Sequence, residues 1–283
     1  MKLLRHGPRG REKPGMLDAQ GVIRDLSEVI RDIDGAALAA ESLAKLAALD
    51  PSKLPRLEEG VRLGPPVSGM KNLVCIGLNY ADHAAETGAE PPKEPIVFLK
   101  SLGALSGPYD DIIIPPGSRK TDWECELCVV IGSTARYVSE ADAMHHVAGY
   151  CVGNDVSERE WQIERGGTWD KGKGFDSFGP IGPWLVTKDE VADPQNLHMW
   201  TDIDGQREQD GSTRTMIFGV AKLVSYVSHC ITLHPGDVIF TGTPPGVGLG
   251  KKPEPWFLRP GQEVRVGIEG LGEQRARSVA HVG

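Results

Sequence analysis

Short runs of apolar and β-branched residues, separated by glycine and proline turns, recur along most of the chain. Such runs are typical of buried strands. The expected strands cover residues 2–6, 15–17, 21–26, 73–76, 96–99, 112–114, 127–131, 147–152, 180–186 and 238–241, with a hairpin within 198–218. Helical spacing is confined to residues 36–49, 81–88, 141–146, 155–165 and 217–227. The pattern therefore predicts a series of short strands with a few helices between them.

A small N-terminal domain is predicted at residues 1–68, ahead of a larger domain at residues 69–283. Its pattern contains three short strands and one amphipathic helix. A proline-rich connector follows, with prolines at positions 51, 55, 65 and 66. Nothing in this unit indicates chemistry, and its one histidine, His6, is expected on a surface strand.

The most informative stretch is residues 121–132, Thr-Asp-Trp-Glu-Cys-Glu-Leu-Cys-Val-Val-Ile-Gly. Alternate side chains of a strand point to one face, so Glu124 and Glu126 project together, with Asp122 and Cys128 on their side. Two adjacent carboxylates below an apolar strand repel each other and lose hydration. Either one is protonated or a cation lies between them, and a divalent metal such as magnesium suits hard oxygen ligands. A solvent-facing edge strand with hydrated glutamates is the alternative.

A second candidate group lies on a short helix at Ala81–Gly88, for which Asn79 is the expected N-cap and Gly88 the stop. His83 and Glu86 are three residues apart and share one face of this helix. A carboxylate that orients an imidazole is what a general base needs. The alternative is a surface His–Glu pair. The following turn is rich in proline, which suits a mobile lid.

A third group follows the strand at residues 147–152. Asp155 lies at the strand end, and Arg159 and Gln162 follow on the same stripe of the expected helix. Asp155 could complete an oxygen site with the two glutamates, while Arg159 and Gln162 could donate to a bound anion. An N-cap role for Asp155 is the alternative.

Two loops contribute the last candidates. A glycine-flanked loop carries Lys171 and Lys173, and one lysine could reach inward over an oxyanion, although plain solvation is the alternative. The loop at residues 242–251 matches neither common nucleotide motif, and two prolines remove amides that a phosphate cradle would use. It is predicted to present backbone groups and the Thr243 hydroxyl to a small anion such as a carboxylate.

Composition narrows the function by exclusion. The net charge of −8 argues against nucleic-acid binding, which needs a basic face. No apolar run reaches membrane-spanning length and no signal-peptide core is present, so a cytoplasmic location is expected. The odd count of five cysteines suits buried reduced thiols. Cys125 and Cys128 spell C-x-x-C, but strand geometry places them on opposite faces, which disfavours a shared metal or redox role.

Taken together, these motifs resemble the fumarylacetoacetate hydrolase family from about Asn72 to the C-terminus. The motifs in family order are Gly77-Leu78-Asn79-Tyr80 with His83 and Glu86, Glu124-x-Glu126, Asn154-Asp155-Val156-Ser157 with Arg159 and Gln162, Lys173-Gly174-Phe175-Asp176, and Thr241-Gly242-Thr243-Pro244. The resemblance implies a mostly β (α+β) fold, a mixed β-roll with peripheral helices, behind a small N-terminal α+β domain. It also implies a homodimer.

The resemblance further implies a role for each candidate residue. Glu124, Glu126 and Asp155 hold Mg²⁺, with Mn²⁺ or Ca²⁺ as substitutes. His83 with Glu86 activates water from a lid, and Lys173, with Lys171 as the fallback, stabilises an oxyanion or enolate. The residues implied to orient substrate are Arg159, Gln162 and Thr243.

The implied activity is hydrolytic carbon–carbon cleavage of a small keto acid, an acylpyruvate (2,4-diketo acid), with sugar-derived diketo acids among the candidates. The departing fragment leaves as a pyruvate enolate held by the metal. Ureidoglycolate lyase, oxaloacetate-type decarboxylase and isomerase activities of the same family use the same kind of site and stay open as alternatives. A non-enzymatic module that binds small acids is a further alternative, although it needs neither the His83–Glu86 pair nor Lys173.

Overall fold

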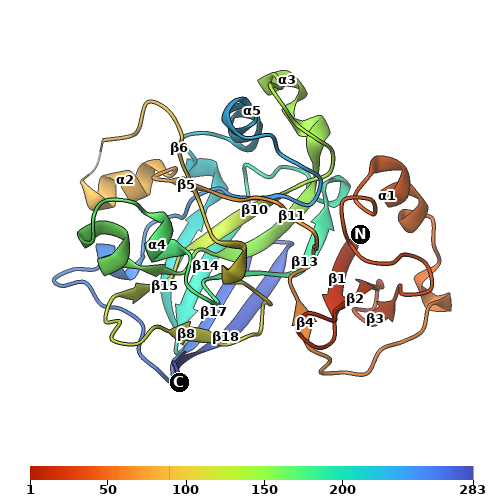
Figure 1. The fold of residues 1–283 in the computed structure, drawn as a ribbon, viewed down its shortest axis with the longest axis horizontal. Helices are drawn as coiled ribbons and strands as arrows, with labels where there is room; N and C mark the ends of the chain where they lie inside the picture. Colours follow the sequence, from red (N-terminus) through yellow and green to blue (C-terminus); the bar gives the residue numbers. More distant parts are fainter. Residues whose placement is uncertain (89, 283) are drawn as a thin grey trace.

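The computed structural model describes residues 1–88 and 90–282, and its largest unit is an eleven-stranded sheet (Figure 1). The strand order is β3-β2-β1-β13-β11-β10-β16-β5-β6, with β4 paired to β1 and β7 paired to β13. The strand bounds are β1 (Lys2–His6), β2 (Lys13–Leu17), β3 (Ile23–Asp25), β4 (Leu63–Gly64), β5 (Leu73–Gly77), β6 (Ile96–Leu99), β7 (Leu105–Ser106), β10 (Cys125–Ile131), β11 (Val147–Asn154), β13 (Gly179–Thr187) and β16 (Val238–Phe240).

Two smaller sheets complete the β structure. The first has five strands in the order β15-β14-β17-β18-β8, and the second pairs β12 with β9. Their bounds are β8 (Ile112–Ile114), β9 (Thr121–Asp122), β12 (Ser157–Glu158), β14 (His198–Ile203), β15 (Gln206–Ser212), β17 (Glu263–Ile268) and β18 (Gly272–Ala280). Antiparallel pairs predominate, but β16 with β5, β18 with β8 and β13 with β7 run parallel. The fold is thus mostly β with mixed sheets, as the sequence predicted.

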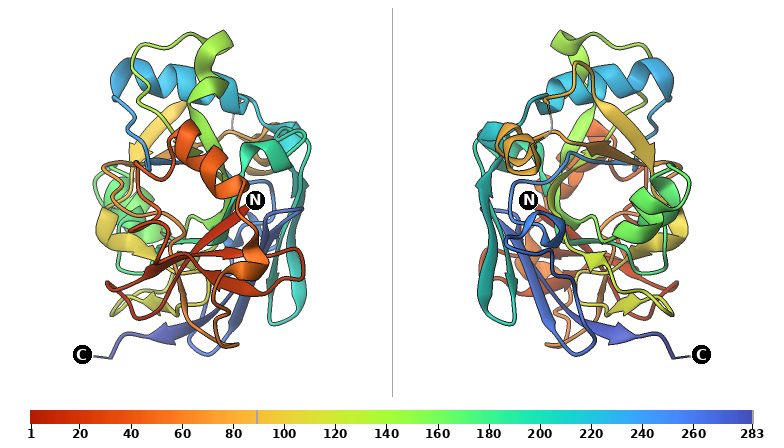
Figure 2. Two further views of the ribbon diagram at one scale, coloured as in Figure 1. Left: turned by 90° about the vertical axis from the view of Figure 1, so that its right-hand side faces the viewer. Right: turned by 90° about the vertical axis from the view of Figure 1, so that its left-hand side faces the viewer.

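The helices lie around the sheets rather than between them (Figures 1 and 2). They are α1 (Ala40–Ala47), α2 (Ala81–Thr87), α3 (Glu140–Ala143), α4 (Asp170–Lys173), α5 (Val220–Cys230), the π-helix η4 (Glu160–Glu164), and the 3₁₀ turns η1 (Pro51–Lys53), η2 (Leu102–Ala104), η3 (Met144–His146), η5 (Lys188–Glu190), η6 (Thr213–Thr215) and η7 (Gly248–Gly250). Within residues 1–88 and 90–282, no helix has both the length and the apolar character needed to cross a membrane.

Strand β10 is apolar on both faces because it separates two hydrophobic clusters. Cys125, Leu127 and Val129 pack into the cluster that includes α5 and the five-stranded sheet. Cys128 and Val130 point the other way, into a cluster that reaches the N-terminal strands. The two cysteines of the C-x-x-C pair therefore lie on opposite faces, as predicted. Burial on both faces also holds the acidic start of the strand in place.

The N-terminal strands continue the large sheet. Strand β1 pairs antiparallel with β13, and Lys2 lies opposite Val186. The division at residue 68 stays a prediction. The expectation of an exposed His6 is wrong, because this side chain is only 5% exposed. Burial lowers the pKa of His6, although Asp25 partly offsets this effect.

Three predicted elements differ in detail from the structure. The helix expected at residues 36–49 is shorter, since the Asp34 side chain accepts from the amides of Ala36 and Ala37 and holds a turn ahead of α1. The helix expected at residues 155–165 is replaced by β12 and the π-helix η4, because residues 157–158 pair with β9. The lysine loop at residues 171–173 is the short helix α4.

The helix that carries His83 is confirmed at Ala81–Thr87, with Gly88 left-handed at its end. Its predicted N-cap is wrong. Tyr80 occupies the N-cap position without a side-chain cap, and the Asn79 side chain instead donates to the carbonyls of Phe218 and Thr241. A buried amide that bridges two distant segments satisfies more backbone groups here than a cap would.

Candidate metal centre and active site

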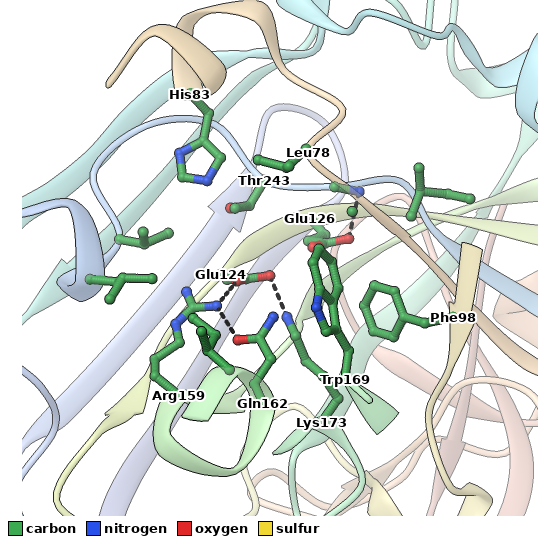
Figure 3. Close-up of a pocket in the computed structure, with 16 residues that line it drawn as sticks. Leu78, His83, Phe98, Glu124, Glu126, Arg159, Gln162, Trp169, Lys173 and Thr243 are labelled. Carbon is green, nitrogen blue, oxygen red and sulfur yellow. Dashed lines mark hydrogen bonds and ion pairs between the residues drawn. The ribbon is translucent and has the colours of Figure 1, made fainter. Parts of the chain in front are cut away.

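The acidic ends of β10 and β11 meet at one cavity of about 260 Å³ (Figure 3). Cys125 pairs with Asn154, and just beyond this pair the amide of Asp155 donates to the carbonyl of Glu124 at 2.9 Å. Oxygen atoms of Glu124, Glu126 and Asp155 lie within 4.8 Å of one another, and all three side chains are buried. The structure thus brings together the three carboxylates that the sequence singled out.

The three carboxylates differ in their electrostatic surroundings. Burial raises the pKa of Glu126 well above its usual range, and the negative charges of Asp155 and Glu124 raise it further. Burial also opposes ionisation of Glu124, but Lys173 and Arg159 outweigh it and lower its pKa. These surroundings therefore favour the neutral form of Glu126 and the anionic form of Glu124, and an additional cation near Glu126 would oppose its protonation.

Lys173 lies between two of the carboxylates. Its Nζ donates to Glu124 Oε2 and to Asp155 Oδ2, each at 2.8 Å, and its side chain is almost fully buried. Burial opposes its charge, but Asp155 and Glu124 outweigh that effect and raise its pKa. Lys171 is exposed. The geometry thus favours Lys173, the preferred lysine of the sequence analysis.

A second buried lysine, Lys100, was missed. Its Nζ lies 2.5 Å from Asp155 Oδ1 and donates to the carbonyls of Val156 and Lys173. Lys100 follows β6 directly and belongs to no recognised motif. The only feature of the sequence that could have pointed to Lys100 is its place at the end of an apolar strand. Most lysines in such positions are exposed to solvent, so this feature does not indicate a buried role.

Arg159 joins the cavity to a carboxylate behind it. Its Nε donates to Asp122 Oδ2 at 2.8 Å, and its Nη1 lies 2.6 Å from Glu124 Oε1 and 2.9 Å from Gln162 Oε1. Figure 3 shows Arg159, Gln162 and Lys173 below Glu124. Asp122, Glu124, Glu126 and Asp155 thus face Lys100, Arg159 and Lys173, four buried carboxylates against three buried cations.

The loop at residues 242–251 donates its amides to carboxylates of the protein itself. The amide of Gly242 donates to Glu126, that of Gly246 to Glu86, and those of Gly248 and Leu249 to Asp122. That the loop presents backbone groups and the Thr243 hydroxyl to a small anion stays a prediction, but these four amides are not free for that role. They instead hold the acidic side chains in position.

His83 and Glu86 form the predicted pair on α2. His83 Nδ1 lies 3.2 Å from Glu86 Oε2, and Figure 3 shows the imidazole across the cavity from Glu124. Burial favours neutral Glu86, but hydrogen bonds from His83 and Gly246 outweigh it and lower its pKa. An ionised Glu86 can orient the imidazole and stabilise its protonated form.

Comparison with known proteins accounts for this arrangement. Residues 72–279 match the family described as Fumarylacetoacetate (FAA) hydrolase C-terminal. The chain is also 63% identical over 274 residues to a Burkholderia lata protein with a general hydrolase name, and the match covers 97% of both chains. The chain belongs to the fumarylacetoacetate hydrolase family.

Solved structures of this family share the whole fold. The fumarylacetoacetate hydrolase of Exiguobacterium antarcticum is 34% identical with a TM-score of 0.84, covering 99% of this chain and all of that one. The 2-hydroxyhepta-2,4-diene-1,7-dioate isomerase of Mycobacterium marinum is 30% identical with a TM-score of 0.76 and full coverage of both chains. The maleylpyruvate hydrolase of Sphingobium sp. SYK-6, solved with manganese(II) and pyruvate, is 28% identical with a TM-score of 0.83 and full coverage of both chains. The family therefore comprises hydrolases and isomerases, and a structural neighbour binds a divalent metal.

The donor set of this family member fits such an ion. Three carboxylates offer the hard oxygen ligands that Mg²⁺, Mn²⁺ and Ca²⁺ prefer. Asp155 Oδ1 is buried and accepts no hydrogen bond of good geometry among the described residues, although Lys100 lies at ion-pair distance. A divalent cation would also place positive charge beside Glu126 and so favour its ionised form. The roles of Glu124, Glu126 and Asp155 as ligands stay a prediction.

The sequence analysis also missed Gln209 on β15. Its side chain connects β10, the strand at the candidate metal site, to the loop at residues 242–251. Its Oε1 accepts from the amide of Cys125 at 2.9 Å and from Thr201 Oγ1 at 2.7 Å. Its Nε2 donates to Thr243 Oγ1 at 2.8 Å and to the carbonyl of Pro244 at 2.9 Å. The Thr243 hydroxyl donates to the carbonyl of Cys125, so toward a substrate it can only accept.

We expect Gln209→Leu to weaken metal binding as well as the fold. Cys125 lies between two of the candidate ligands, so loss of the contact to its amide loosens their spacing. Buried groups left without partners lower the free energy of unfolding by about 2–4 kcal/mol. Magnesium titration of turnover and urea unfolding measure the two effects. Gln206→Leu, at an exposed position of the same strand, is the control, and an unchanged magnesium titration for Gln209→Leu contradicts the positioning role.

Proposed function

We propose that this protein is a divalent-metal-dependent hydrolase that cleaves an acylpyruvate into a carboxylate and pyruvate, with magnesium as its metal. One observation carries the proposal. Glu124, Glu126, Lys173 and His83 line a single cavity. Asp155 lies with the two glutamates and Glu86 lies against His83, which completes the set that metal-assisted hydrolysis needs. The family relationship and the manganese and pyruvate bound to a structural neighbour support it.

In the proposed reaction His83 is the general base. It accepts a proton from water, whose oxygen forms a bond to the carbonyl carbon of the acyl group, and Glu86 stabilises the resulting imidazolium. The bond between that carbon and the pyruvyl methylene then breaks, and its electron pair passes to the pyruvate fragment as an enolate. Proton transfer to the methylene carbon completes the products, one carboxylate and pyruvate.

The remaining groups act on charge and orientation. A divalent ion, when bound, supplies a Lewis acid for the pyruvyl end of the substrate. Lys173 provides a fixed positive charge close to the developing oxyanion or enolate. Two further side chains, Arg159 and Gln162, orient the substrate from the cavity floor. Asp122 and Glu124 hold Arg159 in place, and Arg159 in turn donates to Gln162.

The direct test is turnover of a substrate panel with magnesium. Acylpyruvates, oxaloacetate, sugar-derived diketo acids and ureidoglycolate are each supplied, and the ultraviolet absorbance of the diketo enol reports cleavage. We expect acylpyruvates to lose this absorbance and to release stoichiometric pyruvate. Metal-dependent turnover of oxaloacetate or ureidoglycolate alone contradicts the proposal.

An isomerase is the second candidate, because an isomerase of this family is as similar to the chain as the maleylpyruvate hydrolase. Substitution of His83 distinguishes the hydrolase from the isomerase. We expect His83→Ala to lower acylpyruvate hydrolysis by about 10²–10⁴-fold, because attack by water needs a base. An isomerisation that only moves a proton along the bound substrate need not lose activity in the same way.

Initial rates on an acylpyruvate and on a 2-hydroxydienedioate measure this difference. The control is His145→Ala, which removes an exposed imidazole outside the cavity and is expected to leave both rates unchanged. If His83→Ala hydrolyses the acylpyruvate at the wild-type rate, His83 does not activate the water.

A further inference from the structure

Away from its acidic centre, the cavity wall is apolar. Figure 3 shows Phe98 and Trp169 side by side next to Lys173, and their ring centroids are 5.4 Å apart with the rings edge to face. A Cβ added at Gly77 would lie 2.3 Å from the Trp169 ring, so the backbone packs directly against the indole. The other apolar lining side chains are Ile76, Leu78, Ile163, Val247 and Leu249.

The cations that line the cavity are already paired with carboxylates. Lys173 contacts Glu124 and Asp155, and Arg159 contacts Asp122 and Glu124. No other lysine or arginine lines the cavity within the described residues. His83 faces the negative charge of Glu86. Among the described residues, each cation of the wall therefore already has a carboxylate partner, and no unpaired cation remains for a negative group on the far end of a substrate.

We propose that the acyl arm of the substrate is uncharged and ends in an apolar group. This inference rests on the proposed function, since it assumes that the pyruvyl end occupies the acidic centre. A short arm then extends along a wall of aliphatic and aromatic side chains. A second carboxylate on that arm loses hydration there without gaining a partner, which disfavours its binding.

The half-exposed side chain of Ile163 extends the apolar wall to the rim of the cavity. Its side chain is 52% exposed although it is large and apolar, and it lines the cavity from η4. A bound acyl arm would cover it and gain the free energy of apolar burial. Ile163 is thus a specificity-determining position for the arm.

The test compares succinylpyruvate with its isostere, in which two methyl groups replace the terminal carboxylate oxygens. The two arms have the same number of heavy atoms, and the isostere replaces a charged, planar end with an uncharged, apolar one. We expect kcat/KM for the isostere to exceed that for succinylpyruvate by about 100-fold. Equal or faster turnover of succinylpyruvate overturns the inference and leaves the proposed function intact. Absence of cleavage for every acylpyruvate tested overturns the proposed function itself.

A charge placed at the rim provides the second measurement. Ile163→Lys adds a cation at a position exposed enough to accept it without loss of the fold. We expect it to narrow the preference for the isostere by about 10-fold, mainly through KM for succinylpyruvate. The matched control is Val29→Lys, which adds the same charge at a 43% exposed position outside the cavity. An unchanged preference in Ile163→Lys, or an equal change in both variants, contradicts the role of Ile163.

Discussion

We expect Glu126→Gln to abolish metal-dependent turnover and to leave the protein folded. The side chain is 1% exposed, and its Oε2 accepts from the amide of Gly242 at 2.7 Å, a bond that a glutamine oxygen can also accept. Burial and the neighbouring carboxylates raise the pKa of Glu126, so the neutral amide resembles the acid of the metal-free protein. The amide cannot supply the charge that a divalent ion needs. We expect turnover to fall by at least about 10³-fold.

Turnover with saturating magnesium and thermal unfolding with and without magnesium measure the two parts of this prediction. The wild-type protein should gain stability from the metal and the variant should not. Glu158→Gln is the control, because Glu158 is also fully buried but contacts Ser118 and Thr121 outside the cavity. A variant that regains full activity after removal and return of metal refutes Glu126 as a ligand.

Lys173→Met separates charge stabilisation from metal binding. Methionine keeps most of the volume of the side chain but removes the ammonium that contacts Glu124 and Asp155. We expect kcat to fall by about 10²–10³-fold, the usual loss when one preorganised donor to developing charge is removed. Metal should still bind, since the two carboxylates lose a competing cation.

Rapid-mixing rates on an acylpyruvate give kcat, and titration with Mn²⁺ monitored by its magnetic resonance signal gives metal affinity. Lys171→Met removes an exposed lysine of the same short helix and should change neither value. Loss of Mn²⁺ binding together with activity in Lys173→Met indicates that this lysine acts on the assembly of the site, which contradicts a role in charge stabilisation.

Local pattern located most strands of the large sheet and the pairs that lie on one element, although the expected list lacked β17 and β18. Glu124 and Glu126 share a face because strand side chains alternate, and His83 and Glu86 meet because helix positions three apart are neighbours. Prediction from local pattern failed where a segment distant in the sequence forms hydrogen bonds with the same residues. The amides of residues 157–158 pair with β9, which prevented the expected helix, and Asn79 bridges Phe218 and Thr241 when it was expected to cap α2.

The sequence by itself determined the strand periodicity, the two residue pairs and the family motifs, because each depends on residues close together in the chain. Only the tertiary structure decided that Asp155 meets the glutamates, that Lys100 and Gln209 support them, and that the 242–251 amides serve Glu126, Glu86 and Asp122. These contacts join segments tens of residues or more apart. Their partners are selected by burial, because a buried carboxylate or amide without a partner is unfavourable, and burial depends on the packed fold rather than on local spacing.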